Sequence, residues 1–208
     1  MVIPHGRKAD YAATGFATLY TDTPSAWEEG LRHLRLLGHQ RIALLLNDSL
    51  ESFRHSSNEQ QNRLLETFGA SGEPALIKAV EYSFPSIDQA IRELLALPNP
   101  PTAIQCYSDF FALHACQSLN AAGVKIPEQI SVLGFCGYPG GKLLSPPLST
   151  VDVDYNGIGL QAAELLFSSE KWYLPGVPPP LIATPFHLAS RGSTAIPAAV
   201  KEGKHVAG

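Results

Sequence analysis

The chain has 208 residues, of which 45% are hydrophobic and 16% are charged, a composition typical of folded globular proteins and not of disordered ones. Its formal net charge is −4 and its Lys and Arg residues form no long cluster, which argues against strong nucleic-acid binding by this chain. The first residues lack the apolar core of a secretory signal and no apolar run is long enough to cross a bilayer, so we expect a cytoplasmic protein without a membrane partner.

Helices and strands alternate along most of the chain. Apolar residues at helical spacing predict helices over 24–37, 58–68, 86–97, 109–122 and 155–167. Short apolar runs predict strands over 41–46, 75–82, 102–107 and 130–135, and a final extended segment over 181–194. This rhythm predicts an α/β fold with a parallel sheet covered by helices on both faces.

Polar residues mark the expected starts of three helices. Thr23 precedes Pro24, which suits the first helical turn, and Asp109 and Asp154 each precede a helical segment. Asp154 also belongs to DVDYNG (152–157), which fits the first half of a calcium loop. Position twelve of that loop is Ala163 and not the Glu that calcium requires, so we interpret Asp154 as a helix cap.

The stretch ISVLGFCGYPGG (130–141) is a buried strand followed by a glycine-rich loop, a usual place for a ligand in an open α/β sheet. The loop is not a phosphate loop, because Cys136 stands where the first glycine is needed and Leu143 follows Lys142. The sequence contains none of the common catalytic or metal-binding motifs, so we predict no catalytic residue, no metal and no cofactor.

The three cysteines differ in their surroundings. Cys106 lies in an apolar strand and Cys116 in a helix, so both are expected to be inert core thiols. Cys136 lies at the end of a strand, where it could line a pocket or act as a nucleophile. No histidine stands in a recognisable relation to it, which favours the pocket wall and leaves a hydrolase as an alternative.

Four segments resemble, in order and spacing, the sensor domain of LacI/GalR-type transcription regulators. They are GLRHLRLLGHQRIALL (30–45), PTAIQCYSDFFALHACQSLNAAGVKIPEQISVLGF (101–135), SPPLSTVDVDYNGIGLQAAELL (145–166) and LASRGST (188–194). The resemblance implies a fold like that of periplasmic binding proteins, with two Rossmann-like lobes, three crossings between them, and a ligand cleft at the carboxyl ends of the strands.

The resemblance also implies a division of the chain. We expect a remnant of the first lobe over 1–40, a complete second lobe over 41–145, a return to the first lobe over 146–180, a crossing back over 181–197 and a tail over 198–208. The family's helix-turn-helix is missing from this chain, so contact with DNA is expected only through a module that this chain lacks.

Six ligand-binding positions follow from the resemblance: Asn58, Tyr82, Ser108, Asp109, Cys136 and Tyr155. Asn58 aligns with an arginine of the family, and Arg54 could take that role instead. The two tyrosines could instead simply pack, and Asp109 could simply cap its helix. Cys136 and Gly137 stand where the family has two aspartates, so we expect an effector that is less polar than a free hexose or that is bound largely by first-lobe residues which this chain lacks.

The resulting hypothesis is a non-enzymatic effector-sensing domain of a LacI/GalR-like regulator. Its expected partners are a small-molecule effector, a sugar or a related metabolite, and a second copy of the chain in a homodimer. Two alternatives remain open: a dimerising remnant that binds no ligand, and a solute-binding protein of a transporter.

Overall fold

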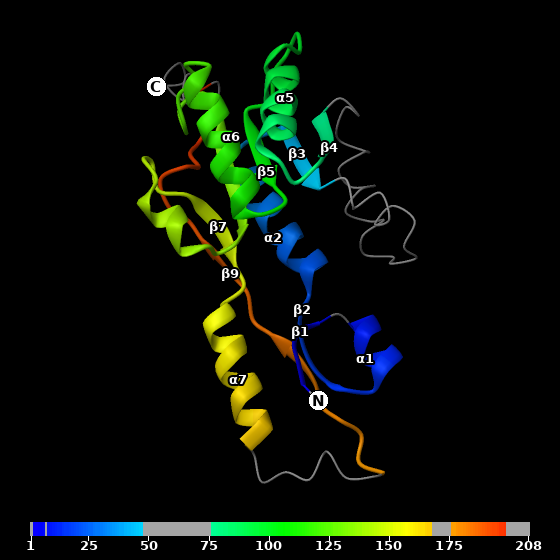
Figure 1. Ribbon diagram of the computed structural model, residues 1–208. Coiled ribbons are helices and arrows are strands. Elements are labelled where there is room, and N and C mark those ends of the chain that lie inside the picture. The colour runs from blue at the N-terminus through cyan, green and yellow to red at the C-terminus, as the bar shows by residue number, and fades with distance from the viewer. Residues whose placement is uncertain (1, 7, 48–75, 168–175, 199–208) are drawn as a thin grey trace.

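The computed structural model describes residues 2–6, 8–47, 76–167 and 176–198, which form two β-sheets and their covering helices (Figure 1). A six-stranded sheet, here called the large sheet, has the strand order β4-β3-β5-β6-β7-β9. A three-stranded sheet, here called the small sheet, has the order β1-β2-β8. Every pairing is parallel except that of β7 with β9. The predicted α/β class with a parallel sheet is therefore confirmed.

The strands are β1 (Val2–Gly6), β2 (Ala17–Thr21), β3 (Ile42–Asn47), β4 (Ile77–Val80), β5 (Ala103–Cys106), β6 (Ser131–Cys136), β7 (Ser149–Asp152), β8 (Leu181–Thr184) and β9 (His187–Ala189). The helices are α1 (Lys8–Thr14), α2 (Thr23–Leu36), α5 (Phe84–Leu95), α6 (Asp109–Ala121) and α7 (Tyr155–Phe167), with a short 3₁₀ helix, η3 (Pro139–Leu143). The helix predicted over 58–68 lies outside the described residues.

Helices cover both faces of the large sheet. Neighbouring residues of a strand point to opposite faces, and β6 shows which helix lies on which side. The backbone of Gly30 on α2 lies against the side chain of Leu133, whereas the carboxylate of Asp109 on α6 lies against Gly134. Helix α2 therefore covers one face and α6 the other, where α5 packs beside α6 (Figure 1).

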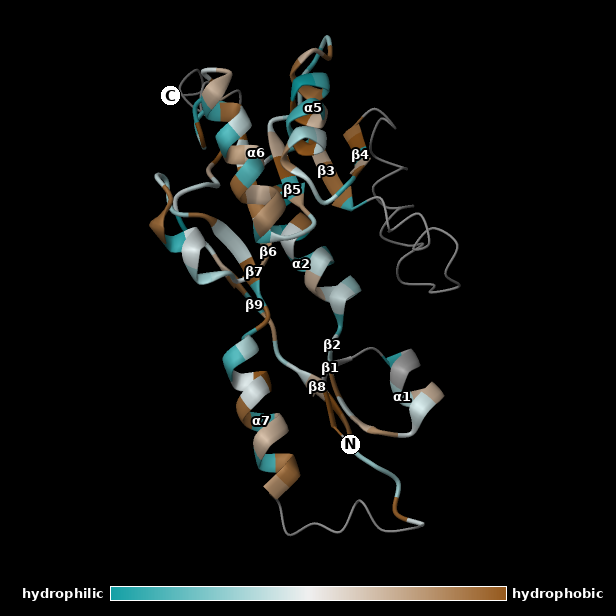
Figure 2. Cartoon of the chain, in the orientation of Figure 1, coloured by the Kyte–Doolittle hydropathy of each residue, from teal (hydrophilic) through white to brown (hydrophobic). Residues whose placement is uncertain are grey.

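The buried apolar residues form two separate clusters. The larger lies in the large sheet and its helices and includes Trp27 of α2, Phe111 of α6 and Leu133 of β6. The smaller lies in the small sheet and α7 and consists of Ala17, Leu19, Ile158, Ala162 and Leu165. Brown residues along β1 and the lower end of α7 mark this second region in Figure 2.

The chain passes between the two sheets at three places. It leaves β2 at Thr21 for α2, leaves β7 at Asp152 for α7, and leaves β8 at Thr184 for β9. The segment predicted as one extended run over 181–194 is thus two strands that belong to different sheets. A buried bond of 2.9 Å between the hydroxyls of Thr21 and Thr184 joins two of these crossing points.

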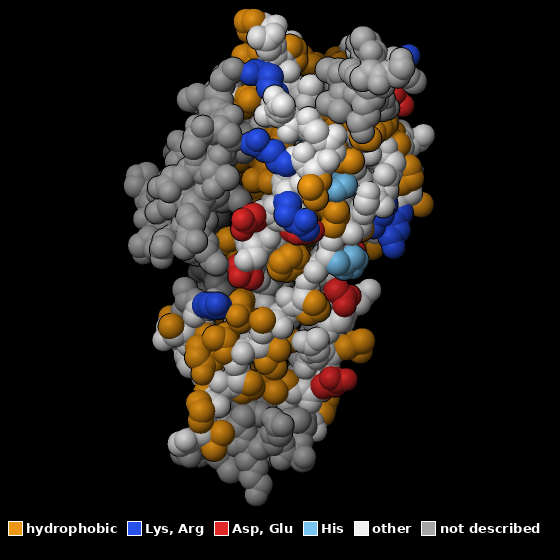
Figure 3. All heavy atoms as spheres, turned by 180° about the vertical axis from the view of Figure 1, so that it is seen from behind, with side chains coloured by type: hydrophobic (Ala, Val, Ile, Leu, Met, Phe, Trp, Pro, Cys, Tyr) orange, Lys and Arg blue, Asp and Glu red, His pale blue; other side chains and the backbone are white. Residues whose placement is uncertain are grey.

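The surface differs between the two ends of the molecule. Seen from behind, hydrophobic side chains gather over the lower part, which holds the small sheet, and charged side chains gather higher up (Figure 3). Helix α7 contributes three exposed apolar residues, Leu160, Leu166 and Phe167. Within the described ranges, none of the helices is both long and apolar enough to traverse a membrane.

Candidate functional site

A cavity of about 780 Å³ lies at the carboxyl ends of β5, β6 and β7. Such ends are the usual ligand position in open α/β sheets, because the loops that follow parallel strands meet at one edge. Its described lining comes from the turn before α5 (Tyr82), the start of α6 (Ser108, Asp109, Phe110, Leu113), the loop after β6 (Cys136, Gly137, Tyr138, Pro139, Lys142) and the crossing into α7 (Asp152, Asp154, Tyr155, Asn156).

Ser108 ends the loop after β5 and occupies the N-cap position of α6. Its hydroxyl makes no capping bond, and its buried Oγ has no hydrogen-bond partner in the part of the chain that the structure describes. A buried hydroxyl without a partner is unfavourable unless another molecule supplies one. Because Ser108 lines the cavity, a ligand there could satisfy it.

Asp109 holds the cavity wall together, which corrects its predicted role as a helix cap. It is buried in the first turn of α6, and its carboxylate accepts bonds from the backbone N–H of Tyr138 and from the Thr150 hydroxyl, the latter at 2.7 Å. Both partners lie outside α6, so Asp109 ties the helix to the loop after β6 and to β7. Burial raises the pKa of Asp109 to about 6, although these bonds oppose the shift.

Cys136 is half-buried at the end of β6, with a left-handed backbone φ of 97°. Burial raises the pKa of its thiol, while a hydrogen bond with Tyr155 partly opposes that rise. The thiol is therefore protonated near neutral pH, and a protonated thiol is a poor nucleophile. Cys136 is thus a neutral part of the cavity wall that also contacts the first residue of α7.

Aromatic rings line part of the cavity. Tyr82 stacks on Phe110 with a distance of 4.3 Å between ring centroids and an angle of 17° between planes, and it meets Phe111 edge-on. Tyr82 is nevertheless 53% exposed, and Tyr155 is 47% exposed. Both rings keep surface that a ligand could cover.

Five of the six sequence-predicted positions line this cavity: Tyr82, Ser108, Asp109, Cys136 and Tyr155. The sixth, Asn58, lies outside the described residues, as does its alternative Arg54. The sequence argument did not single out Phe110, Tyr138, Lys142, Asp152 or Asn156 as ligand positions. Tyr138 and Lys142 belong to the glycine-rich loop after β6. Their place in a loop that follows a buried strand is the sequence feature that could have identified them as ligand positions.

The DVDYNG segment forms a helix start and not a metal loop. Asp152 Oδ1 accepts a bond of 2.9 Å from the backbone N–H of Asp154, and Asp154 Oδ1 accepts one of 3.1 Å from Gly157. The predicted cap at Asp154 is therefore confirmed. Among the described residues, no three side chains of His, Cys, Asp or Glu are grouped to hold a metal ion.

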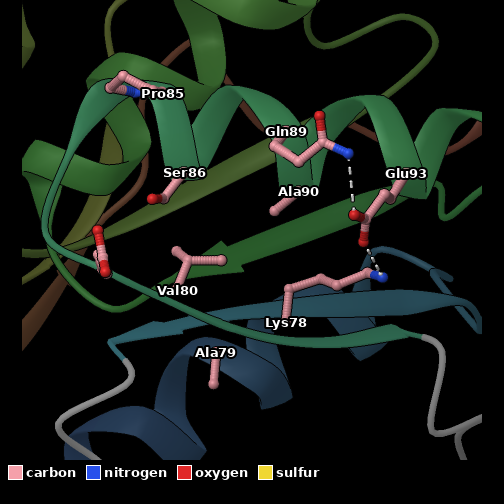
Figure 4. Close-up of a pocket in the computed structure, with 9 residues that line it drawn as sticks. Lys78, Ala79, Val80, Pro85, Ser86, Gln89, Ala90 and Glu93 are labelled. Atoms are coloured by element: carbon pink, nitrogen blue, oxygen red, sulfur yellow. Dashed lines mark hydrogen bonds and ion pairs between the residues drawn. The ribbon is translucent and has the colours of Figure 1, made fainter.

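A second cavity, of about 510 Å³, lies between β4 and α5 (Figure 4). Its lysine pairs with Glu93, because Lys78 Nζ lies 2.7 Å from the Glu93 carboxylate, which also accepts a bond of 3.1 Å from Gln89. None of the sequence-predicted positions lines it. The cavity at the strand ends is therefore the better candidate for a ligand.

Two sheets joined by three crossings, with a cavity where parallel strands end beside one crossing, define the class of periplasmic-binding-protein-like domains. The family model of the periplasmic binding protein-like domain matches residues 31–194. The chain belongs to this family and is homologous to repressors of the LacI family, as its sequence motifs predicted.

Curated relatives match over about seven tenths of this chain. The HTH-type transcriptional repressor CytR of Escherichia coli (strain K12) is 30% identical over 149 residues, which cover 72% of this chain and 44% of CytR. The probable HTH-type transcriptional repressor ExuR of Bacillus subtilis (strain 168) is 32% identical over 144 residues, covering 68% of this chain and 42% of ExuR. The chain thus spans less than half the length of either relative.

Solved structures show the same fold. A LacI family transcriptional regulator from Enterococcus faecalis with bound ribose has a TM-score of 0.71 at 24% identity, covering 88% of this chain and 65% of its own. A LacI family transcriptional regulator from Arthrobacter in complex with lactose has a TM-score of 0.70 at 25% identity, covering 86% and 66%.

Proposed function

We propose that this chain is a non-enzymatic, effector-sensing domain of a LacI-like regulator of transcription. The observation that carries the proposal is the convergence of Tyr82, Ser108, Asp109, Cys136 and Tyr155 on one cavity. These positions were chosen from motif alignment alone and lie on four separate segments of the chain. Two of the similar solved structures contain ribose or lactose, which supports a sugar or a related metabolite as the effector.

The cavity wall supports binding and not catalysis. It offers exposed aromatic faces at Tyr82 and Tyr155, and a buried hydroxyl at Ser108 that a ligand could pair. The thiol of Cys136 is held in its protonated form, which opposes the alternative of a cysteine hydrolase. The Cys136 thiol accepts hydrogen bonds more weakly than a carboxylate, so the polar contacts to an effector would come from other groups of the wall, such as the Ser108 hydroxyl.

The position of the cavity supports a sensing role. Ser108 begins α6 on the large sheet, and Tyr155 begins α7, which packs on the small sheet. A ligand that touches both residues stabilises one arrangement of the two sheets over others by the difference in its affinity for them. Contact with DNA, in the cytoplasm, would then belong to a segment outside this chain.

The test is calorimetric titration of the chain with ligands selected by a thermal-shift screen of sugars and nucleosides. We expect at least one compound to bind, and we expect Ser108→Ala to weaken that binding by about threefold to tenfold, as the loss of one hydrogen bond predicts. Ser118→Ala is the matched control, because Ser118 is also buried on α6, its Oγ has no partner among the described residues, and it is not among the described lining of the cavity.

Two results would count against the proposal. Equal losses of affinity in both serine variants would place the effect in helix α6 and not in the cavity. No binding by any compound would favour the alternative of a dimerising remnant without a ligand. A solute-binding protein of a transporter would bind a ligand equally well, and it is disfavoured by the relatives, which are repressors by name.

We further propose that the chain forms a homodimer, with helix α6 as part of the pairing surface. The outward face of α6 carries the exposed residues Gln117 and Asn120, and the helix has no Lys, Arg, Asp or Glu beyond its first turn. A helix surface with little charge meets a copy of itself across a two-fold axis without like-charge repulsion.

A further inference from the structure

The charges around the cavity are unbalanced. Asp152 and Asp154 lie two residues apart and are joined through Asp152 Oδ1 and the backbone N–H of Asp154. Neither carboxylate forms an ion pair with a Lys or Arg of the described residues. Lys142 is the one cation among the described lining residues, and no bond from it to either carboxylate is present. The described part of the cavity lining therefore has a surplus of negative charge.

The helix starts at the cavity do not offset this surplus. Helix N-termini attract anions, since their first N–H groups are unpaired and the macrodipole is positive there. Helices α6 and α7 both begin at the cavity. A carboxylate caps the start of α7, whereas the Asp109 carboxylate lies beside the start of α6 and is bonded to Tyr138 and Thr150. Asp154 bonds the Gly157 N–H of α7, and Asp109 lies in the first turn of α6. An anionic ligand would have to displace or repel these groups.

The aromatic residues favour a cation. Tyr82, Tyr138 and Tyr155 are 53%, 57% and 47% exposed and lie along the cavity lining. The face of an aromatic ring carries partial negative charge and attracts an ammonium group within about 6 Å of its centre. Aromatic rings and carboxylates together form the usual surroundings of a bound amine. A phosphate group would have only Lys142 of the described lining residues as a positively charged partner.

We propose that this cavity selects ligands that carry a protonated amine over their neutral parents, and neutral parents over their phosphate esters. The inference rests on the proposed ligand-binding function and adds to it the chemical class of the ligand. Asp152 and Asp154 supply the charge, and the tyrosine rings supply the surface over which the amine and its carbon skeleton lie.

The experiment compares matched triples that differ in one substituent. The probes are glucosamine, glucose and a glucose phosphate, and an aminodeoxy-adenosine, adenosine and adenosine monophosphate. Each is titrated calorimetrically into the chain at about pH 6.5, where an aliphatic amine is protonated. Within the triple that binds, we expect the amine to bind about tenfold more tightly than its neutral parent and the phosphate ester to bind more weakly than either.

Two variants test the source of the preference. Asp152→Asn keeps an oxygen that can accept from the Asp154 N–H, and Asp154→Asn keeps a good capping residue, so both should fold. Each should reduce the ratio of amine affinity to neutral-parent affinity, both measured in the same variant, by about threefold. Glu128→Gln is the matched control, because Glu128 is exposed near the amino end of β6, at the opposite edge of the sheet.

The outcomes separate this inference from the function on which it rests. Binding of a neutral parent or a phosphate ester more tightly than the amine overturns the inference while the sensing function stands. An amine preference that persists in both aspartate variants also overturns it. Failure of every member of both triples to bind, in a chain that does bind other neutral compounds, refutes the amine class. Failure to bind any compound refutes the sensing function itself.

Discussion

Asp109 shows how one residue can be found by motif and still have an unexpected role. Its place before a helix suggested a cap, which is a contact within four residues of the chain. In the structure its carboxylate instead bonds Tyr138 and Thr150, which are 29 and 41 residues away. Local rules could not identify these partners, because they are set by the pairing of β6 with β7.

The pKa of Asp109 predicts how stability changes with pH. Its pKa is about 6 in the folded protein against a usual 3.8, so the folded state binds the extra proton between these values. The free energy of unfolding therefore falls as pH rises through this window, by about 2 to 4 kcal/mol. Asp109→Asn, which cannot ionise, should remove that fall. Urea unfolding followed by tryptophan fluorescence at about pH 4.5 and about pH 7 measures how the free energy of unfolding changes with pH in the wild type and in the variant.

Comparing the wild type with Asp109→Asn separates the effect of Asp109 ionisation on stability from the effects of the other titrating groups. Wild type should lose stability relative to Asp109→Asn as pH rises. Equal changes in the two proteins would show that the Asp109 carboxylate ionises as easily in the folded chain as in the unfolded one.

At the scale of elements, the loop after β6 depends on its backbone conformation. Cys136 and Gly137 have φ of 97° and 75°, which turns the chain sharply from β6 towards η3. A Cβ at Gly137 would also lie 2.2 Å from Cγ of Asp152. The glycine is therefore required both by its conformation and by the carboxylate that packs over it.

Gly137→Ala and Gly123→Ala separate these two requirements. Both glycines have φ of 75°, but nothing lies within 4 Å of the position that a Cβ would take at Gly123. Each change should cost about 1 kcal/mol for the conformation, and Gly137→Ala should cost a further 1 to 3 kcal/mol, roughly, for the overlap. Thermal unfolding of the two variants gives the difference, and equal midpoints would show that Asp152 moves away freely.

Most strands and helices of the large sheet could be predicted from the sequence. Four strands, β3 to β6, and four helices, α2, α5, α6 and α7, follow from apolar patterns in the sequence, because each segment buries one or both of its faces. The segment 181–194 was predicted as one run, since β8 and β9 have similar composition, and their assignment to different sheets depends on distant partners. Strand β1 and helix α1 were not predicted, because residues 2–14 mix polar and apolar residues without a clear period.

For the candidate site, the sequence predicted five residues that line the cavity but not which hydrogen bonds those residues make. The family resemblance led to Ser108 and Tyr155, which stand just before and at the start of two predicted helices. The resemblance could not show that the Ser108 hydroxyl has no partner among the described residues, or that Tyr155 bonds Cys136. Both facts depend on how loops that are distant in the sequence pack together. Asp152 was considered only as a calcium ligand, and its place at the cavity became apparent from the crossing into α7.

At the scale of the whole molecule, the proposed homodimer gives a direct measurement. The chain has a mass of 22.4 kDa, and sedimentation at tens of micromolar should give about twice that mass. Gln117→Arg should weaken the dimer, because it brings like charges together across a symmetric pair of α6 helices. Gln40→Arg makes the same change on an exposed residue outside α6 and should leave the mass unchanged. A monomeric wild type would refute the proposal.

The crossings between the sheets have a consequence for how the chain folds. Pairing of β2 with β8 brings together Thr21 and Thr184, which are 163 residues apart, so closing this loop from an unfolded chain carries a large entropic cost. The strands from β3 to β7 pair with strands that are closer in the sequence. Once these pairs have formed, the part of the chain between Thr21 and Thr184 that is still unfolded is shorter. The small sheet should therefore assemble last, and its slow, long-range closure should limit the rate at which the molecule becomes complete.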